Sequence, residues 1–195
     1  VWSYSAGVAG TYQDVLAGND SVTLVNVAAA NAPAVLAFNN AKGLFVDENL
    51  RQAVSYALDY DAFKTYFGSA YAQIPNRGFV PETTVGYKQT EKLTTNQAKA
   101  AEYMAAAGYS EKNANGFYVN GDGQIASFTL TVNAAKEAHV GYAEMIKNQL
   151  EQFGIQVNLD TVDKDSYNAK TSNKFSENNI TMEAAIYGYT AAGMG

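Results

Sequence analysis

The residues most able to carry out chemistry include a single histidine, His139, so nucleophilic catalysis with a histidine base would have to use it. An α/β hydrolase would also need a Gly-x-Ser-x-Gly turn to present its serine, and the sequence contains none. His139 stands at the start of a helical pattern, near the carboxyl end of an expected strand, where ligands of α/β proteins collect. It therefore either contacts a ligand, or caps its own helix or bonds a neighbouring carbonyl.

No combination of residues indicates a metal or cofactor site. Asp59 and Asp61 are separated by one residue and cannot share a helical face, so we expect solvated surface charges. Residues 113–123 lack the acids at positions 1, 3 and 5 and the closing glutamate of a calcium loop. Neither glycine-rich phosphate motif occurs, and the absence of cysteine excludes disulfides, thiolate catalysis and zinc–thiolate sites. We expect no metal and no cofactor.

Tyrosine is unusually frequent, with 14 in the chain. Tyr187 and Tyr189 are two residues apart near the end of an expected strand, so they should point to the same face. Such a pair could stack on or clamp a ligand, because tyrosine offers flat apolar area with a polar tip. The alternative, that both pack beneath another element, is slightly favoured by the sequence alone.

The overall charge excludes some partners. The net charge of −6 argues against a nucleic-acid surface, which would need clustered Lys and Arg. No run of six like charges occurs, so a basic membrane patch is unsupported. The longest apolar stretch, near residues 27–38, is broken by Asn31 and Pro33 and is too short to span a bilayer. We expect no nucleic-acid partner and no membrane insertion by these residues.

The clearest pattern is a strand–helix–strand unit over residues 125–162. Phe128, Leu130 and Val132 alternate with polar residues, as in a half-buried strand. Apolar residues then recur at three- and four-residue steps until Gly154, which is typical of a helix stop. A second strand follows directly, so we expect a βαβ unit with a right-handed crossover.

Weaker patterns predict the remaining elements. They are a helix over 11–17, strands over 21–27 and 34–38, a long helix from the cap Asp47 to Gly68, an irregular excursion over 71–87, a helix opened by a capping box of Thr94 and Gln97 and running to Ala107, a hairpin from 117–119 through the turn 120–123, a helix capped by Asp163 or Asp165, and a last strand over 180–189. At 195 residues the chain suits one domain.

Five stretches in register resemble the oligopeptide-, dipeptide- and nickel-binding family (family 5) of extracytoplasmic solute-binding proteins that serve ABC transporters. They are Val35-Leu36-Ala37-Phe38-Asn39; residues 45–59 with Asp47, Arg51-Gln52-Ala53 and Ala57-Leu58-Asp59; Lys99-Ala100 with Gly108-Tyr109; Gly121-Asp122-Gly123 with Phe128-Thr129-Leu130-Thr131; and residues 143–150 with Phe153-Gly154-Ile155. The resemblance covers roughly residues 14–189.

The resemblance implies an α/β fold: a periplasmic-binding-protein-like lobe with a mixed sheet, flanking helices and a βαβ core. Residues 1–195 would form a single domain, the continuous second lobe of a two-lobed protein whose first lobe is missing. The start at Val1 and the end at Gly195, directly after a strand-like run, fit a piece of a longer chain, although a processed N-terminus with a loose tail is the alternative. The family implies an extracytoplasmic location, as a periplasmic protein or a cell-surface lipoprotein. It also implies delivery of the solute to an ABC permease, and no catalysis.

Ligand contacts in that family follow the last strand, often in a Trp-x-x-Asp phrase. Tyr187-Gly188-Tyr189-Thr190 occupies this region here, with tyrosine in place of tryptophan and no evident acid. A polar or basic residue before the central helix also contacts ligand in some members, which points to Asn133, Lys136 and His139. A peptide is the expected solute, and an oligosaccharide or another solute is the alternative.

Two other classes of protein stay open. An enzyme of unfamiliar type would use a carboxylate or tyrosine pair, with strongly perturbed titratable groups in a cleft. A pure interaction module would show a large flat apolar patch in place of a groove.

Overall fold

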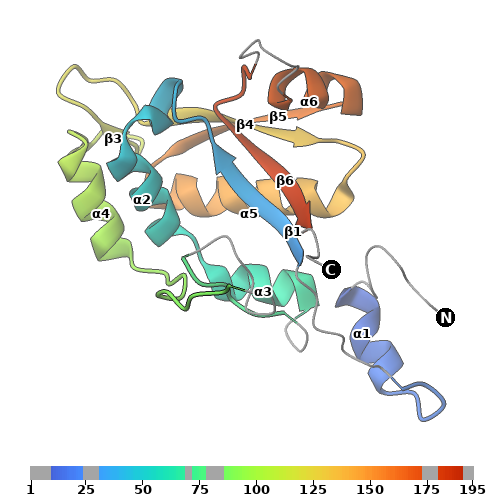
Figure 1. Ribbon diagram of the computed structural model, residues 1–195. Helices are drawn as coiled ribbons and strands as arrows, with labels where there is room; N and C mark the ends of the chain where they lie inside the picture. The colour runs from blue at the N-terminus through green and yellow to red at the C-terminus, as the bar shows by residue number, and fades with distance from the viewer. Residues whose placement is uncertain (1–9, 24–30, 69–71, 78–85, 173–179, 191–195) are drawn as a thin grey trace. The chain divides into compact units, whose positions relative to one another are not determined.

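The computed structural model describes residues 10–23, 31–68, 72–77, 86–172 and 180–190 (Figure 1). The chain divides into two compact units, a smaller one of Val1–Asn31, Asp59–Leu93 and Ala191–Gly195 and a larger one of Ala32–Leu58 and Thr94–Thr190. The single domain expected over residues 1–195 stays a prediction.

Among its described residues, the smaller unit contains two helices, α1 (Gly10–Ala17) and α3 (Tyr60–Gly68). Helix α1 confirms the helix expected over residues 11–17. Residues 75–77 and 91–93 run antiparallel, since Arg77 N donates to Glu91 O at 2.6 Å and Leu93 N to Pro75 O at 2.9 Å. Most of the strand expected over 21–27 and half of the excursion expected over 71–87 lie outside the described residues.

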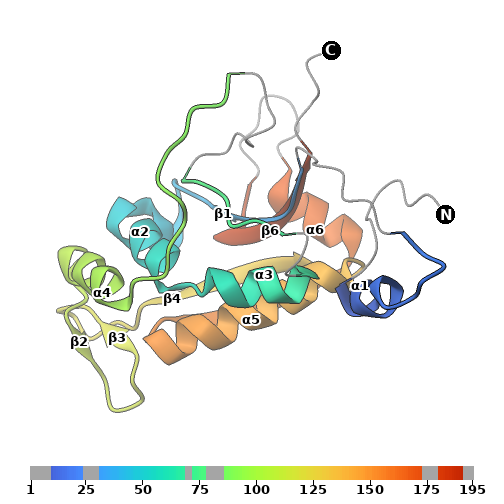
Figure 2. The same cartoon turned by 90° about the horizontal axis from the view of Figure 1, so that it is seen from below.

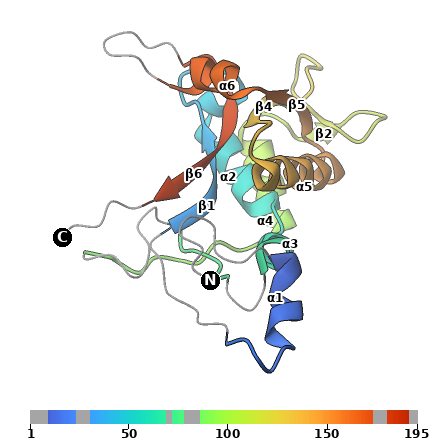
Figure 3. The ribbon, with the colours of Figure 1, turned by 90° about the vertical axis from the view of Figure 1, so that its right-hand side faces the viewer.

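The larger unit is built on a four-stranded sheet. Its strands are β1 (Asn31–Phe38), β4 (Ser127–Asn133), β5 (Gln156–Val162) and β6 (Ala184–Thr190), in the order β1-β6-β4-β5. Strand β4 pairs in parallel with both β5 and β6. Strand β1 runs the other way, because the residue after its end, Asn39, donates its N–H to Glu183 O at the start of β6, at 2.8 Å. The expected mixed sheet is confirmed, and Figures 1 and 3 both show β1 beside β6.

The expected βαβ unit is also confirmed. Helix α5 (Glu137–Phe153) connects β4 to β5, and helix α6 (Lys164–Thr171) follows β5. Helix α5 ends at Gly154, whose φ is 123°. A Cβ atom at Gly154 would lie 2.9 Å from Gly116 O and from a ring carbon of Tyr118. Glycine is therefore required both for its conformation and for the space around it.

Buried apolar side chains lie on both faces of the sheet, and Tyr167, Met182 and Ala185 form the cluster under α6. On the face that α5 covers, Phe128, Leu130 and Val132 of β4 are buried, and α5 buries Tyr142, Ala143, Ile146 and Leu150. Phe45, in the 3₁₀ helix η1 (Gly43–Val46), places its ring 4.7 Å from that of Phe128 and 4.2 Å from that of Phe38. Helices α2 (Glu48–Ala57) and α4 (Gln97–Ala106) pack together, with the rings of Tyr56 and Tyr103 stacked at 5.8 Å. Aromatic contacts therefore join the elements around the sheet.

The long helix expected from Asp47 to Gly68 is wrong, although Asp47 caps its start as expected, accepting from Asn49 N at 2.8 Å. Helix α2 ends at Ala57, and Leu58 is extended, with ψ 140°. The carbonyls at this end bond to a distant segment: Tyr56 O accepts from Asn96 N at 2.8 Å, Ala57 O from Gln97 Nε2 at 2.8 Å, and Leu58 O from Thr95 Oγ1 at 2.7 Å. These bonds satisfy the carbonyls without another helical turn.

The capping box expected at Thr94 and Gln97 is wrong for the same reason, because the Gln97 side chain bonds to Ala57 O. Asn96 caps α4 instead, and its side chain accepts from Lys99 N at 2.9 Å. The hairpin expected from 117–119 through the turn 120–123 is present, since Val119 bridges Ile125, Asn120 N donates to Gln124 O at 3.0 Å and Ala126 N donates to Tyr118 O at 2.8 Å. Strand β3 (Tyr118–Val119) also pairs with β2 (Glu111–Lys112), which was not expected.

The two requirements on Gly154 can be separated by experiment. Gly154→Ala should lose about 1–2 kcal/mol from the left-handed backbone and a further amount because Gly116 and Tyr118 must shift. Gly108→Ala is the matched control, since its φ is 86° but no atom lies within 4 Å of an added Cβ. Urea unfolding should therefore rank Gly154→Ala clearly below Gly108→Ala. Equal unfolding free energies for the two variants would contradict this account.

Candidate functional site

The carboxyl ends of β4 and β5 lie side by side, and the chain leaves them in opposite directions. Asn133 ends β4 opposite Val162, which ends β5. Ala134 N donates to Val162 O at 2.8 Å. Beyond these ends the chain enters α5 and α6, which lie on opposite sides of the two strands (Figure 2). Ligands of α/β proteins bind in the crevice at such a switch point.

Asn133 is held firmly at this point. It is only 8% exposed, and its Oδ1 accepts from Ala135 N at 3.0 Å. Its carbonyl accepts from Lys136 N, also at 3.0 Å. Among the described residues, no hydrogen bond is formed by its Nδ2 group. The side chain is thus fixed by its acceptor while its donor remains available to a bound molecule.

Lys136 and His139 lie just beyond Asn133, at the start of α5. Lys136 is exposed and is the N-cap residue, but its side chain makes no capping hydrogen bond. His139 is half-buried in the first turn. The first N–H groups of a helix lack partners within the helix and carry partial positive charge. Together with the Lys136 ammonium, they favour an anionic or carbonyl group at this end.

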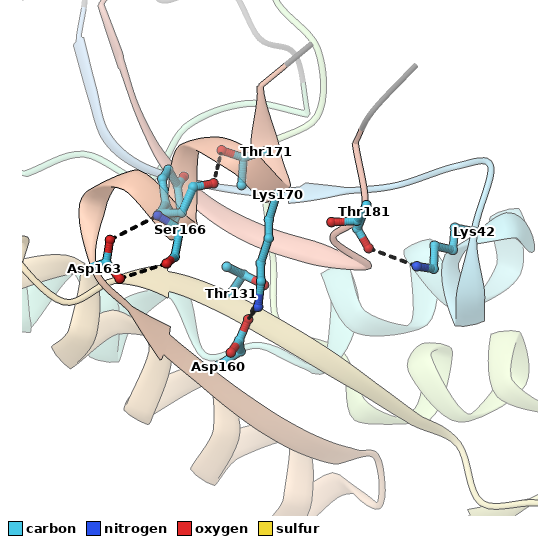
Figure 4. Close-up of polar contacts among 9 residues, drawn as sticks. Lys42, Thr131, Asp160, Asp163, Ser166, Lys170, Thr171 and Thr181 are labelled. Carbon is cyan, nitrogen blue, oxygen red and sulfur yellow. Dashed lines mark hydrogen bonds and ion pairs between the residues drawn. The ribbon is translucent and has the colours of Figure 1, made fainter. Parts of the chain in front are cut away.

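The start of α6 differs, because Asp163 satisfies it. Its Oδ1 accepts from Asp165 N at 2.9 Å and from Ser166 N at 3.0 Å, and its Oδ2 accepts from Ser166 Oγ at 2.7 Å (Figure 4). The Ser166 N–H first, and then the Ser166 hydroxyl, hold the pKa of Asp163 below its usual value. Of the two caps left open by the sequence, Asp163 is therefore the one used, and α6 offers less to a ligand than α5.

Tyr187 shares a face of the sheet with Asn133 and packs against α6. The register sets Thr131 opposite Ala185. Asn133 and Tyr187 each lie two residues further along β4 and β6, so they share the face of the sheet that carries Thr131 and Ala185. The Tyr187 ring lies 5.9 Å from the Tyr167 ring, and its hydroxyl donates to Thr171 O at 3.0 Å. For Tyr187 the structure therefore shows packing beneath another element, the alternative that the sequence slightly favoured. Tyr189 and Thr190 end β6, and their side chains are outside what the structure describes.

A polar cluster on the same face was not predicted. Thr131 is 1% exposed and donates from Oγ1 to Asp160 Oδ2 at 3.2 Å, and Lys170 Nζ donates to the same oxygen at 2.5 Å (Figure 4). The run Thr129, Thr131, Asn133 on the second face of β4 was the available signal, since a buried strand with a polar face needs polar partners. The cluster attaches α6 to the sheet and does not line the carboxyl ends.

Two shallow hollows in the larger unit lie elsewhere. One, of about 470 Å³, is lined by Gly43, Leu44, Val46, Asp47, Leu50, Ala107, Tyr109 and Asn120, and the other, of about 290 Å³, by Asn49, Lys99, Glu102, Tyr103 and Ala106. Neither touches Asn133, Lys136 or Tyr187. Neither hollow lies at the carboxyl ends of β4 and β5, so the candidate site rests on the strand topology.

The described part of the chain contains no group of three or more His, Asp or Glu side chains that could hold a metal ion. Among the described helices, none combines the length and the apolar character needed to cross a lipid bilayer.

A family model for bacterial extracellular solute-binding proteins, family 5 (middle part), matches residues 4–191. Among curated proteins, the oligopeptide-binding protein AppA of Bacillus subtilis is 26% identical over 133 residues, which cover 66% of this chain and 24% of AppA. The chain spans about a quarter of the length of the curated relatives it matches.

Solved structures show the same fold. AppA of Bacillus subtilis in complex with a nonapeptide gives a TM-score of 0.76 at 22% identity, covering 94% of this chain and 36% of AppA. The periplasmic binding protein DppA of Helicobacter pylori in complex with the peptide STSA gives 0.73 at 21%, covering 95% and 32%. NikZ of Campylobacter jejuni in complex with Ni(L-His) gives 0.72 at 17%, covering 94% and 34%. The larger unit therefore has a periplasmic-binding-protein-like architecture.

The tyrosines under α6 give a testable pH dependence. Burial, with a smaller contribution from Tyr187, raises the pKa of Tyr167 from 10.0 to about 12, and its hydroxyl donates to Ile186 O at 2.6 Å. Because the pKa is higher in the folded state, the stabilisation is complete below pH 10 and is lost as the pH rises towards 12. The unfolding free energy of the unchanged chain should therefore fall more steeply over this range than that of Tyr167→Phe.

Urea unfolding at several pH values checks this dependence. Tyr12→Phe is the control, because Tyr12 is 64% exposed, and it should keep the slope of the unchanged chain. A slope unaltered by Tyr167→Phe would show that the proton on Tyr167 does not contribute to stability.

Proposed function

The chain belongs to the bacterial extracellular solute-binding proteins of family 5, and we propose that it forms the second lobe of such a protein, one wall of a cleft that closes on a solute. The observation that carries this proposal is the placement of Asn133. The Asn133 Oδ1 atom accepts from Ala135 N, whereas its Nδ2 group forms no hydrogen bond among the described residues. Asn133 lies just before α5, where the chain leaves β4 and β5 for helices on opposite sides of the sheet. Wall residues of a closing cleft need to be fixed in this way, because ordering them on binding would cost affinity.

A peptide is the solute that we propose. AppA and DppA, which share the fold, are described in complex with peptides. Asn133 Nδ2 suits a peptide carbonyl, and the exposed Lys136 with the start of α5 suits a carbonyl or a terminal carboxylate. His139, Tyr187, Tyr189 and Thr190 remain proposed contacts, with the Tyr187 hydroxyl already engaged by Thr171 O.

The second candidate is another solute bound in the same place. NikZ, with a similar fold, is described in complex with a nickel–histidine species. The segment Tyr187-Gly188-Tyr189-Thr190 lacks the acid of the family's Trp-x-x-Asp phrase, which could pair with a peptide's amino terminus. Its absence favours a solute that offers mainly hydrogen-bond acceptors to the protein. An oligosaccharide is the other acceptor-rich possibility.

The wider role follows from the family as a proposal. The parent protein would lie outside the cytoplasm, in the periplasm or as a cell-surface lipoprotein. It would hold its solute between this lobe and a first lobe, hand it to an ABC permease, and catalyse no reaction. The partners are then the solute, the first lobe and the permease.

The Asn133 donor can be removed without its acceptor. Asn133→Asp keeps the Oδ1 that accepts from Ala135 N but replaces the amide donor, so the turn should remain while the ligand contact is lost. In the product of the complete open reading frame, peptide affinity should fall about tenfold or more, the effect of one lost hydrogen bond and a repelled carbonyl. Isothermal titration calorimetry measures this change.

Asn148→Asp is the matched control, because it makes the same change of charge at an exposed position of α5. It should leave peptide affinity unchanged. Affinity unchanged in Asn133→Asp as well would place the peptide elsewhere in the protein.

The 195-residue chain alone should bind peptide weakly. A cleft encloses its solute between two lobes, and one wall leaves most of the ligand in water. Calorimetry with peptides of the length bound by AppA should therefore detect no micromolar binding to the chain. Micromolar affinity would mean that the site is complete within these residues and that the two-lobed proposal is wrong.

A further inference from the structure

Strand β5 is the end strand of the sheet, so one of its edges lacks a neighbouring strand among the described residues. Gln156 N donates to Ala126 O at 2.9 Å and Val162 O accepts from Ala134 N at 2.8 Å, which shows that residues 156, 158, 160 and 162 direct their backbone groups towards β4. The alternate residues Val157, Leu159 and Thr161 therefore direct theirs away from the sheet. Such an edge is a template for pairing with another strand.

At Val157 the outward groups are already occupied by side chains of α5. Lys147 Nζ donates to Val157 O at 2.8 Å, and Val157 N donates to Glu151 Oε1 at 3.4 Å. Lys147 and Glu151 also form an ion pair four residues apart on the helix. The pair thus covers one end of the open edge, although such partly exposed pairs stabilise a fold little by themselves.

The rest of β5 suits strand pairing. Its sequence, Gln-Val-Asn-Leu-Asp-Thr-Val, contains neither proline nor glycine and only one charge, Asp160. That charge is neutralised by the ion pair with Lys170. Thr161 is exposed and Leu159 is half-buried, and no described residue bonds to their outward backbone groups. Short segments of high strand propensity and low net charge associate readily when exposed.

We propose that the β5 edge is a strand-pairing surface for the β5 edge of a second copy of this chain, and that the Lys147–Glu151 pair keeps it closed. Two antiparallel copies related by a two-fold axis at Leu159 would form three bonded pairs: Val157 with Thr161, Leu159 with Leu159, and Thr161 with Val157. Covering Val157 in each copy removes both outer pairs and leaves only the central one. A second copy is the occupant that fits, because the edge is uncharged overall and a two-fold contact is self-complementary.

Removing the pair tests the proposal. Lys147→Ala/Glu151→Ala leaves the net charge unchanged and uncovers Val157. Sedimentation velocity over a concentration series should show the unchanged chain at 20.9 kDa and the double variant moving towards twice that mass. Glu144→Ala/Lys164→Ala is the matched control, since it removes one exposed charge of each sign from α5 and α6 away from Val157, and it should sediment as the unchanged chain does.

A third variant identifies the surface. Thr161→Pro added to Lys147→Ala/Glu151→Ala deletes an outward N–H at an edge where proline is tolerated, so the chain should return to a monomer. A folded double variant that stays monomeric, a control that associates equally, or a triple variant that remains associated would each overturn the proposal. Circular dichroism establishes that each variant is folded.

Hydrogen exchange on the unchanged chain decides the matter if the double variant does not fold. The Val157 amide should exchange more slowly than the outward amides of Leu159 and Thr161, because only Val157 is covered. Protection of Leu159 and Thr161 equal to that of Gln156 would show that the edge is already paired, and the proposal would fail.

Discussion

The structure depends on β4 being paired on both edges and covered on both faces. It is bonded in parallel to β5 and β6, and it packs Phe128, Leu130 and Val132 against the apolar core. Its other face carries Thr131, which is as buried as the core but bonds to Asp160. A buried strand must find partners for its polar groups, and β4 finds them in Asp160 of the neighbouring strand β5, in Glu183 and in its own following turn.

This arrangement also creates the candidate site. Because α5 and α6 cover opposite faces, the chain must separate where β4 and β5 end, and Asn133 stands at that separation. The two helix starts there are unequal. Asp163 satisfies the first N–H groups of α6, whereas α5 begins at Lys136 without a side-chain cap. The uncapped start of α5 and the uncommitted Asn133 amide are the two features on which the proposed solute site rests.

Two of the tyrosines have a structural role. Tyr167 and Tyr187 donate to backbone carbonyls of each other's elements, Ile186 O and Thr171 O, and so lock α6 against β6. They fix the direction of the last strand, which carries Tyr189 and Thr190 towards the same edge as Asn133. Rigid support of this kind suits the proposed role as one wall of a closing cleft, since the motion would then belong to the proposed lobe as a whole.

The sequence by itself determined the βαβ unit, the cap Asp47, the stop at Gly154 and the family, and it narrowed the cap of α6 to Asp163 or Asp165, because each depends on periodicity or on residues close together in the chain. It did not determine that α2 stops at Ala57, that Asn96 caps α4, or that Thr131, Asp160 and Lys170 meet. The end of α2 and the contact of Thr131 with Asp160 rest on partners tens of residues away, such as Gln97 for Ala57 O. His139, Lys136 and Asn133 were chosen from their position before a helix, and only the parallel register of β4 brought Asn133 and Tyr187 onto one face. Local patterns specify elements, whereas the tertiary structure decides which polar groups meet, because a hydrogen bond is specified by distance in space and not along the chain.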